Sequence, residues 1–259
     1  MRIYIAEDDP SVIGVLEDIL ESSALGRVCG ASEEGAPDPE RIMALDPDLV
    51  LVDLLMPGRD GIQLVRELKD KGYGLIGTGE MGIGNTTPAA AVTAVLLGRR
   101  VEEVTGRGAG LSDEGLERKI AVIRRAIEVN APDPRDPLDV LSKVGGLDIA
   151  GMAGFYLGAA LHHVPVVLDG AISAAAALLA VRLCPDAAKA LIASHRSAEP
   201  SSGLLLDALG LRPIVSADLK LGEGTGAVTI MPMLDMAMSI YRDMATFQGL
   251  GIPPYRRQS

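Results

Sequence analysis

The chain has 259 residues, of which 48% are hydrophobic, and its formal net charge at pH 7 is −11. This length suits one large α/β domain or two small ones, with enough apolar residues for a packed core. The acidic balance, with no basic stripe, argues against nucleic acid or an anionic membrane as a partner. Two distant cysteines, the lack of a signal-peptide pattern and the lack of an apolar run of about 20 residues predict a cytoplasmic protein with buried, reduced thiols.

The first sixty residues predict a βαβαβ unit, because short apolar runs alternate with apolar residues at helical spacing. Pro39 follows Asp38 and marks the start of the second helix. In chain order, we expect a strand over 2–6, a helix over 12–20, a strand over 27–31, a helix from Asp38 and a strand over 48–53.

Acidic residues follow the first and third of these strands. Asp8 and Asp9 come after the first strand, and Asp53 ends the third, before L-L-M-P-G-R-D-G. This pattern resembles the receiver domain of two-component response regulators. The resemblance implies that Asp53 accepts a phosphoryl group and that Asp8, Asp9 and Asp53 hold Mg²⁺, a hard cation that prefers carboxylate oxygens. Thr78 can supply the hydroxyl residue that receivers have after strand four, but the Lys-Pro pair of receivers is missing, so a half-receiver serving only as scaffold is the alternative.

The stretch from Gly77 to Thr87, G-T-G-E-M-G-I-G-N-T-T, predicts a strand, a glycine turn and a helix. Glycines allow a tight turn and bring backbone N–H groups close to a ligand. Thr86 or Thr87 can cap the following helix, whose positive end then faces an anion. The pattern therefore indicates a phosphate or carboxylate site, and the alternative is a plain tight turn.

The middle of the chain continues with helices and one glycine-rich connection over 101–110, whose amides can reach the same ligand. Lys119 lies on a predicted helix, where a lone lysine is usually solvated. We expect helices over 87–97, from Ser112 and from Asp136 to Gly145, and we expect the glycine-rich stretch over 149–161 to pack closely enough to be buried.

Two further strands, over 164–168 and 191–193, end in polar residues. Asp169 follows the first strand, and His195 and Ser197 follow the second. Ligand groups gather at the carboxyl ends of parallel strands, so Asp169 is a candidate ribose or ring contact, with helix capping as its alternative. Ser197 is a candidate phosphate ligand. We interpret His195 as a structural hydrogen-bonding residue, with a catalytic role as its alternative. His162 and His163 are interpreted as structural.

A second glycine loop, L-G-E-G-T-G-A over 221–227, places Glu223 between two glycines at the start of a long helical pattern. An acid at this place is either a functional carboxylate or a residue that interacts with the helix dipole. We expect the methionines of this helix to fill the core rather than to bind a cofactor; they are Met231, Met233, Met236, Met238 and Met244.

Taken together, the motifs from about residue 61 onward resemble the C-terminal part of the nicotinate-nucleotide–dimethylbenzimidazole phosphoribosyltransferase family. The motifs that carry the resemblance are Y-G-L-I-G-T-G-E-M-G-I-G-N-T-T-P, V-T-G-R-G-A-G-L, D-P-L-D-V-L-S-K-V-G-G-L-D-I-A-G, P-V-V-L-D-G, L-I-A-S-H-R-S-A-E-P and L-G-E-G-T-G-A.

The resemblance implies that Glu223 is the general base for an attacking benzimidazole, and that no cofactor is required. It also implies a homodimer, with nicotinate mononucleotide and a benzimidazole-type base as the bound molecules. The residues implied to line the nucleotide and its phosphate are Glu80, Gly82, Gly84, Asn85, Gly108, Lys119, Asp169, Ser197 and Gly224.

Residues 61–72 fit both resemblances, as the receiver's third helix and as the helix before the transferase glycine turn. Ile62, Val65 and Leu68 bury one face under either interpretation. We therefore predict a chimera with a truncated receiver over 1–60 and a transferase-like domain over 61–259. The expected fold is α/β with a doubly wound, mostly parallel, Rossmann-like sheet, in which the receiver start merges with or abuts the transferase sheet, a single continuous sheet being favoured.

Two departures from the transferase pattern bear on activity. In the family the S-A-E-P segment continues with G-H, whereas this chain has Ser201 and Ser202 at these positions. The receiver-like segment takes the place of the family's N-terminal half, which supplies most of the benzimidazole pocket. The alternatives to an active transferase are a phosphoacceptor signalling or nucleotide-binding module and an inactive fusion.

Overall fold

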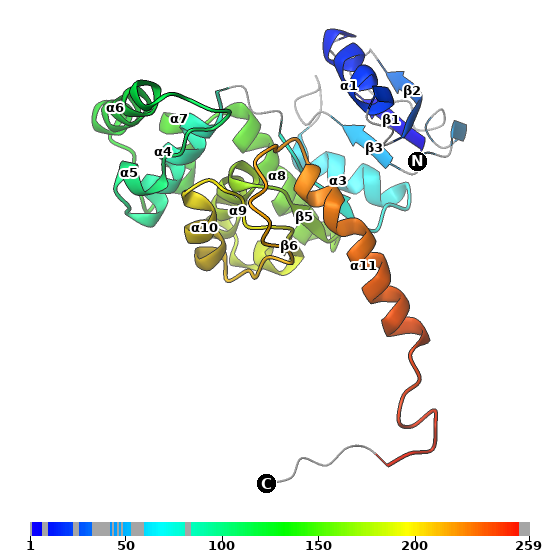
Figure 1. The fold of residues 1–259 in the computed structure, drawn as a ribbon. Helices are drawn as coiled ribbons and strands as arrows, with labels where there is room; N and C mark the ends of the chain where they lie inside the picture. The colour runs from blue at the N-terminus through cyan, green and yellow to red at the C-terminus, as the bar shows by residue number, and fades with distance from the viewer. Residues whose placement is uncertain are drawn as a thin grey trace.

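The computed structural model of the chain describes residues 2–6, 10–22, 26–32, 42, 44–45, 47, 49–52, 60–80 and 84–253. Within these ranges all strand pairs are parallel and fall into two three-stranded sheets, β2-β1-β3 and β4-β5-β6. Helices pack beside both sheets (Figure 1), which confirms the predicted α/β class.

The first sheet consists of β1 (Arg2–Ala6), β2 (Arg27–Ser32) and β3 (Leu49–Val52). Side chains of β1 alternate between its two faces. Ile3 and Ile5 pack with Ile13 and Leu20 of α1 (Pro10–Ser22), whereas Tyr4 packs on the other face. This small core belongs to the receiver-like part of the chain.

The second sheet consists of β4 (Ile76–Gly77), β5 (Val166–Leu168) and β6 (Leu191–Ala193). All three residues of the central strand β5 are buried, as expected for a parallel strand covered on both faces. The helices of this part of the chain are α4 (Thr86–Leu97), α5 (Val101–Val104), α6 (Asp113–Asn130), α7 (Pro137–Val144), α8 (Leu147–His162), α9 (Ala171–Leu183), the 3₁₀ helix η1 (Pro185–Ala190) and α10 (Ser201–Leu209).

The favoured single continuous sheet is not formed by the described strands, because β4 pairs with β5 and not with a strand of the first sheet. Between the sheets lies α3 (Gly61–Asp70), which packs closely against α8. A Cβ at Gly61 would lie 2.5 Å from the carbonyl oxygen of Gly151, and a Cβ at Gly158 would lie 2.7 Å from Cα of Ile62. Glycine thus permits a helix contact that takes the place of strand pairing at the junction.

The buried face of α3 differs from the prediction at one position. Val65 and Leu68 are buried as expected, together with Leu64, but Ile62 is 37% exposed. Its backbone, rather than its side chain, meets α8 at Gly158.

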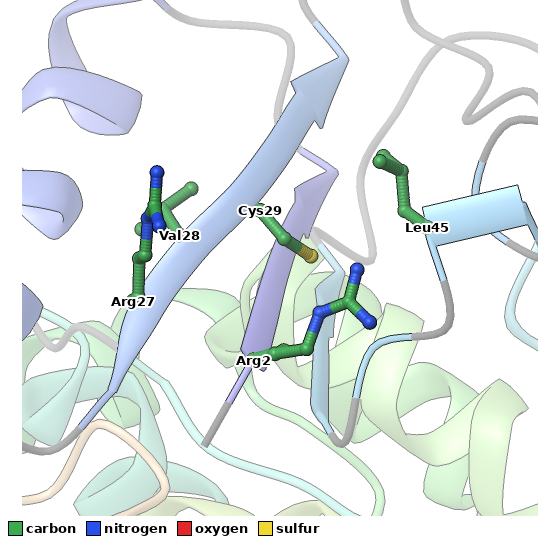
Figure 2. A pocket seen from close by; sticks show the side chains of 5 residues that line it. All are labelled: Arg2, Arg27, Val28, Cys29 and Leu45. Carbon is green, nitrogen blue, oxygen red and sulfur yellow. The ribbon is translucent and has the colours of Figure 1, made fainter.

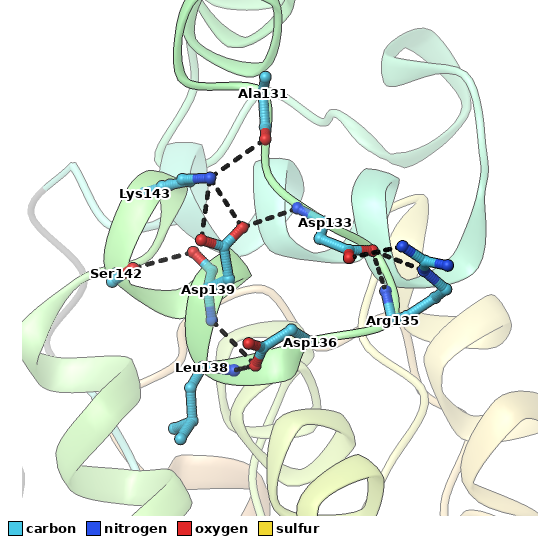
Figure 3. Close-up of polar contacts among 8 residues, drawn as sticks. All are labelled: Ala131, Asp133, Arg135, Asp136, Leu138, Asp139, Ser142 and Lys143. Carbon is cyan, nitrogen blue, oxygen red and sulfur yellow. Dashed lines mark hydrogen bonds and ion pairs between the residues drawn. The ribbon is translucent and has the colours of Figure 1, made fainter.

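The turn between α6 and α7 is held by charged side chains (Figure 3). The helix α7 starts after Asp136 as predicted, and Asp136 caps it, since its Oδ1 accepts hydrogen bonds from the backbone N–H groups of Leu138 and Asp139. Hydrogen bonds from Arg135 lower the pKa of the Asp133 carboxyl to about 2. The carboxylate of Asp139 accepts from Lys143 and from the backbone of Asp133. These contacts fix the turn and involve none of the predicted ligand residues.

The last helix, α11 (Thr225–Asp243), leaves the body of the molecule after its first turns (Figure 1). Its buried residues are Gly226, Ala227 and Ile230. The prediction that its methionines fill the core is wrong for Met233, Met236, Met238 and Met244, which are 42–68% exposed, while Met231 is partly buried. Helical periodicity gave α11 an apolar face, but among the described residues nothing covers the outer part of that face.

The two cysteines also differ from the prediction. Both are free, but Cys29 is half-buried and Cys184 is exposed at the end of α9. Among the described residues, no helix has the length and apolar content to cross a membrane.

Candidate functional site

Three polar residues directly follow the strands of the second sheet: Thr78 after β4, Asp169 after β5 and Ser194 after β6. All three are buried. Because the strands are parallel, their carboxyl ends lie at one edge of the sheet, where α/β proteins bind ligands. Thr78 Oγ1 lies 2.9 Å from the hydroxyl of Tyr156, whose pKa is raised by burial. Thr78 therefore anchors the glycine turn to α8.

The two glycine loops meet at this edge. The backbone N–H of Glu223 donates to the carbonyl oxygen of Glu80 over 3.1 Å, and Gly79 lies against the backbone of Gly224, where a Cβ would clash. Glu223 has a φ of 58° and Gly224 a φ of 77°, so both adopt the left-handed conformation. The side chain of Glu223 is exposed. A strained backbone thus presents this carboxylate at the junction of the two loops.

Asp169 fastens the second loop to the sheet. Its carboxylate accepts hydrogen bonds from Gly224 N (3.1 Å) and Gly226 N (2.7 Å), at the start of α11. Asp169 therefore caps α11 and not the helix that follows it in sequence. His195 lies beside Gly226, and its Nδ1 is 2.9 Å from Ser194 Oγ. Burial lowers the pKa of His195, while the Asp169 carboxylate opposes this shift.

Asn85 occupies the N-cap position of α4 without making a side-chain capping bond. Its amide nitrogen donates instead to Glu80 Oε2 and, over 2.9 Å, to Asp148 Oδ2. Asn85 is only 9% exposed, and its Oδ1 is buried without a hydrogen-bond partner among the described residues. The prediction that Thr86 or Thr87 caps this helix is wrong, because both lie inside its first turn.

Lys119 is buried, contrary to the usual solvated lysine. Its ammonium donates to Thr86 Oγ1 (2.8 Å) and to the carbonyl oxygen of Gly106 (3.0 Å). Burial lowers the pKa of Lys119, and the nearby Glu199 carboxylate acts in the opposite direction. Glu199 also accepts from Gly108 N over 3.0 Å. The 106–108 connection is therefore held between a cation and a carboxylate.

Ser197 lies beside Gly170, at the end of β6. Its Oγ is buried and has no partner among the described residues, while its backbone N–H donates to Ser202 Oγ over 3.0 Å. Ser201 and Ser202, the departure noted in the sequence, begin α10. Ser202 thus orders the Ser197 loop instead of disrupting it.

The structure brings most of the predicted ligand residues together at one edge of the second sheet. Hydrogen bonds connect Glu80 with Asn85 and Glu223, Asp169 with Gly224, and Lys119 with Thr86. Gly84 (φ 85°) comes directly before Asn85, and Gly108 (φ 55°) faces Thr86 and Lys119.

Four predicted site residues, Asp8, Asp9, Asp53 and Gly82, lie outside the described residues. Among the residues that are described, no group of three or more His, Cys, Asp or Glu side chains is arranged to hold a metal ion. The proposed Mg²⁺ site of the receiver-like part therefore stays a prediction.

Sequence reasoning missed two acids that contact predicted ligand residues, Asp148 and Glu199. Asp148 lies in the first turn of α8, where an acid is expected for helix stabilisation alone. Glu199 follows β6 in the S-A-E-P segment. Only the fold brings them to Asn85 and Gly108, so spacing within the sequence could not assign them.

A separate hollow of about 370 Å³ lies on the first sheet, lined by Arg2, Arg27, Val28, Cys29 and Leu45 (Figure 2). Arg2 and Arg27 open β1 and β2, so the hollow lies at the amino ends of these strands. Ligands of open α/β sheets bind at the carboxyl ends. The glycine-loop edge of the second sheet is therefore the candidate site.

Two family models match the chain. One, described as phosphoribosyltransferase, matches residues 55–252, and the other, described as response regulator receiver domain, matches residues 3–77. The two matches share the region that contains α3 and β4, in which residues 61–72 were predicted to serve both parts.

Similar proteins include nicotinate-nucleotide–dimethylbenzimidazole phosphoribosyltransferases from two bacteria. The protein of Acetivibrio thermocellus is 52% identical over 198 residues, which are 76% of this chain and 56% of that protein. The protein of Desulforudis audaxviator is 46% identical over 238 residues, which are 92% of this chain and 67% of that protein. The chain thus spans about half to two thirds of the length of these relatives.

A solved structure, that of CobT from Thermus thermophilus, superimposes with a TM-score of 0.70 at 33% identity. The superposition covers 97% of this chain and 86% of that structure. The sequence and structure comparisons therefore indicate the same family.

Proposed function

Because this chain belongs to the phosphoribosyltransferase family whose model matches residues 55–252, we propose that it transfers phosphoribose from nicotinate mononucleotide to 5,6-dimethylbenzimidazole. The products are nicotinate and α-ribazole 5′-phosphate, the nucleotide of the lower ligand of cobalamin. The observation that carries the proposal is the junction of the two glycine loops, where Glu223 N donates to the carbonyl oxygen of Glu80. The names of the relatives supply the two substrates.

The phosphate end of the nucleotide has matching partners. Lys119 supplies a buried positive charge, and Ser197 supplies a buried hydroxyl without a partner among the described residues. Gly108 adds a backbone N–H that Glu199 now occupies. A phosphate dianion favours such a combination of cation, hydroxyl and amide. We therefore place the 5′-phosphate beside Lys119.

At the other end, a nitrogen of the benzimidazole attacks the anomeric carbon of the ribose from the α face. The bond from that carbon to the nicotinate nitrogen breaks, and nicotinate leaves with the bonding electron pair. The leaving ring becomes neutral at nitrogen, so it needs little acid assistance. The attacking base must lose its other N–H proton, and the carboxylate of Glu223 accepts it.

The side chain of Glu223 is exposed. A bound aromatic base would cover the carboxylate and remove water from it, which makes the carboxylate a better proton acceptor. The receiver-like segment stands where the family's N-terminal half supplies most of the base pocket. The alternative function is accordingly a nucleotide-binding module without transfer activity.

The first experiment is calorimetric titration of nicotinate mononucleotide into the parent chain and into a Lys119→Ala, Ser197→Ala double variant. A nicotinate-release assay with dimethylbenzimidazole follows, with Glu223→Gln as the variant of the base. We expect binding that the double variant loses, and turnover that Glu223→Gln lowers by about 10²–10⁴-fold. A folded parent chain that neither binds the nucleotide nor releases nicotinate would refute the transferase proposal.

A second candidate function rests on the receiver match over residues 3–77. In this function Asp53 accepts a phosphoryl group, with Mg²⁺ held by Asp8, Asp9 and Asp53. The test is labelling with acetyl phosphate and Mg²⁺ in the parent chain and in Asp53→Asn. Label in the parent alone supports phosphorylation of Asp53, and an unlabelled parent excludes it.

We further propose that the transfer requires no cofactor and that the chain forms a homodimer. The bond changes above need no metal or redox group, so EDTA should leave nicotinate release unchanged. Sedimentation velocity measures the oligomeric state of the parent chain and of Met236→Glu, a variant that places a charge on the exposed face of α11. A monomeric parent chain would exclude the homodimer.

A further inference from the structure

The side-chain amide of Asn85 is held by carboxylates from two different segments. Its Nδ2 carries two N–H groups, and the two acceptors within reach are Glu80 Oε2 and Asp148 Oδ2. A carboxylate accepts hydrogen bonds and cannot donate them. The opposite orientation of the amide would place Oδ1 against both carboxylates, so the orientation follows from the chemistry of its neighbours.

The same orientation leaves Oδ1 of Asn85 as a buried acceptor with no partner among the described residues. Asn85 is 9% exposed, so this oxygen has lost its hydration as well. A buried polar atom without a hydrogen bond is costly to folding. Such an atom beside a glycine turn indicates that a ligand supplies the missing donor.

The neighbours of Asn85 indicate which part of a bound nucleotide would lie next to its Oδ1. The next residue, Thr86, accepts from Lys119 at the proposed phosphate end. On its other side, Glu80 both accepts from Asn85 and receives the backbone N–H of Glu223 from the proposed base end. In a nucleotide, the ribose lies between the phosphate and the base, and its hydroxyls are hydrogen-bond donors.

We propose that Asp148 is a positioning residue that, with Glu80, fixes the Asn85 amide so that Oδ1 accepts a hydrogen bond from a ribose hydroxyl of the nucleotide. Asp148 acts through Asn85 and does not itself contact the reacting atoms. The proposal rests on the proposed function for the identity of the nucleotide. The orientation of the Asn85 amide does not depend on the nucleotide, so this part of the proposal is tested without added nucleotide.

The chain offers a direct measurement of the amide, because it contains only two asparagines, Asn85 and Asn130. Protein labelled with ¹⁵N-asparagine therefore gives two side-chain NH₂ pairs. Asn130 is exposed and donates one bond, to the carbonyl oxygen of Ala126, so it serves as an internal reference. We expect both protons of Asn85 to exchange slowly with water.

Replacing the acid tests its role. In Asp148→Ala, one proton of the Asn85 amide should lose its acceptor, move upfield and exchange faster, while the Asn130 pair stays unchanged. Asp113→Ala is the matched control, since it removes a first-turn acid from α6 that does not contact Asn85. An Asn85 pair that is the same in the parent and in Asp148→Ala overturns the positioning role.

Binding tests the ligand contact. Nicotinate mononucleotide and its 2′-deoxy and 3′-deoxy analogues are titrated into the parent, Asp148→Ala and Asp113→Ala. One analogue should bind the parent and Asp113→Ala about tenfold more weakly than the nucleotide does. The Asp148→Ala variant should lose this preference, because the Asn85 side-chain amide is no longer held by Asp148.

The outcomes separate the two proposals. A parent chain that binds all three nucleotides equally overturns the ribose contact while leaving nucleotide binding intact. A parent chain that binds none of them overturns the proposed function and the ribose contact, and the NMR comparison then still decides whether Asp148 positions Asn85.

Discussion

Lys119 is a charged residue of the candidate site that is buried at a cost to folding. Its ammonium is buried against one hydroxyl and one carbonyl oxygen, with its pKa lowered by burial. A buried cation without a directly bonded carboxylate destabilises the ligand-free fold. In the proposed function, the same charge binds the 5′-phosphate of the nucleotide.

Lys119→Met should therefore leave the free energy of unfolding unchanged or raise it. The variant should also weaken the binding of nicotinate mononucleotide by about 10- to 100-fold, because a charged hydrogen bond to phosphate is lost. Urea unfolding and calorimetry measure the two effects. Lys143→Met, which removes an ion pair of the α6–α7 turn, is the control and should not change the affinity. A strongly destabilised Lys119→Met chain with normal affinity would contradict this assignment.

His195 gives a pH dependence whose sign follows from its burial. Its pKa in the folded chain lies below the ordinary value, so the unfolded chain binds the proton more readily. This contribution to stability is complete above about pH 6.5 and is lost as the pH falls toward the folded pKa. The difference in urea midpoint between the parent and His195→Gln should thus be larger at pH 7.5 than at pH 5. A difference that grows toward pH 5 would mean that His195 is charged in the fold.

At this scale the sequence predicts local bonds and misses distant ones. The helix starts at Ser112 and Asp136 were predicted correctly, and each of these side chains accepts hydrogen bonds from residues at most three positions away. The cap of α4 was wrong, because Asn85 uses its side chain on Asp148, far along the chain. Asp148 and Glu199 could not be assigned for the same reason.

Among the elements, α3 and α8 form the contact that separates the two sheets. A Cβ at Gly158 would lie 2.7 Å from Cα of Ile62, whereas a Cβ at Gly154 would meet its nearest neighbour, Gly61, only at 4.0 Å. The two glycines are one helical turn apart and differ mainly in this respect.

Gly158→Ala should lower the free energy of unfolding by about 1–3 kcal/mol, because the added methyl group forces the helices apart. Gly154→Ala is the matched control, and it should be neutral or stabilising by up to about 1 kcal/mol, since alanine favours the helix more than glycine does. Equal effects of the two substitutions on thermal unfolding would show that helix propensity alone acts here.

The positions of helices and strands in the sequence were largely predictable, but which of them pack or pair with one another was not. Apolar runs placed β5 and β6 to within two residues, and the predicted 221–227 loop precedes α11 except for residues 225–227, which form the first turn of that helix. Whether Met236 is covered, or whether β4 joins β3 or β5, depends on packing between segments. A pattern of apolar residues predicts which face of a helix or strand is buried, but it does not predict which other element covers that face.

The whole molecule contains separate hydrophobic cores. Ile3, Ile5, Ile13 and Leu20 form a small cluster on the first sheet, and the main core surrounds the second sheet. Small cores give small stabilities. We therefore expect the receiver-like part to unfold before the rest of the chain.

Urea unfolding followed by hydrogen exchange should thus show two transitions. Ile5→Ala should lower the first midpoint, with a cost of about 2–5 kcal/mol, and leave the second unchanged. Nicotinate mononucleotide at about 100 times its dissociation constant should raise only the second midpoint, because it increases the free energy of unfolding of that part by about 2.7 kcal/mol. A single transition that both changes shift together would show that the α3–α8 contact couples the two cores fully.

The bonds from Gly224 and Gly226 to Asp169, and from Glu223 to Glu80, also set the order in which the site is completed. Contacts between segments so far apart in sequence form late in folding, after the local ones. During synthesis, Glu80 and Asp169 emerge from the ribosome well before the loop that closes over them. A nascent chain stalled before residue 221 would hold a folded sheet with an open edge. Under the proposed function, a nucleotide would therefore find its complete site only when the start of α11 has left the exit tunnel.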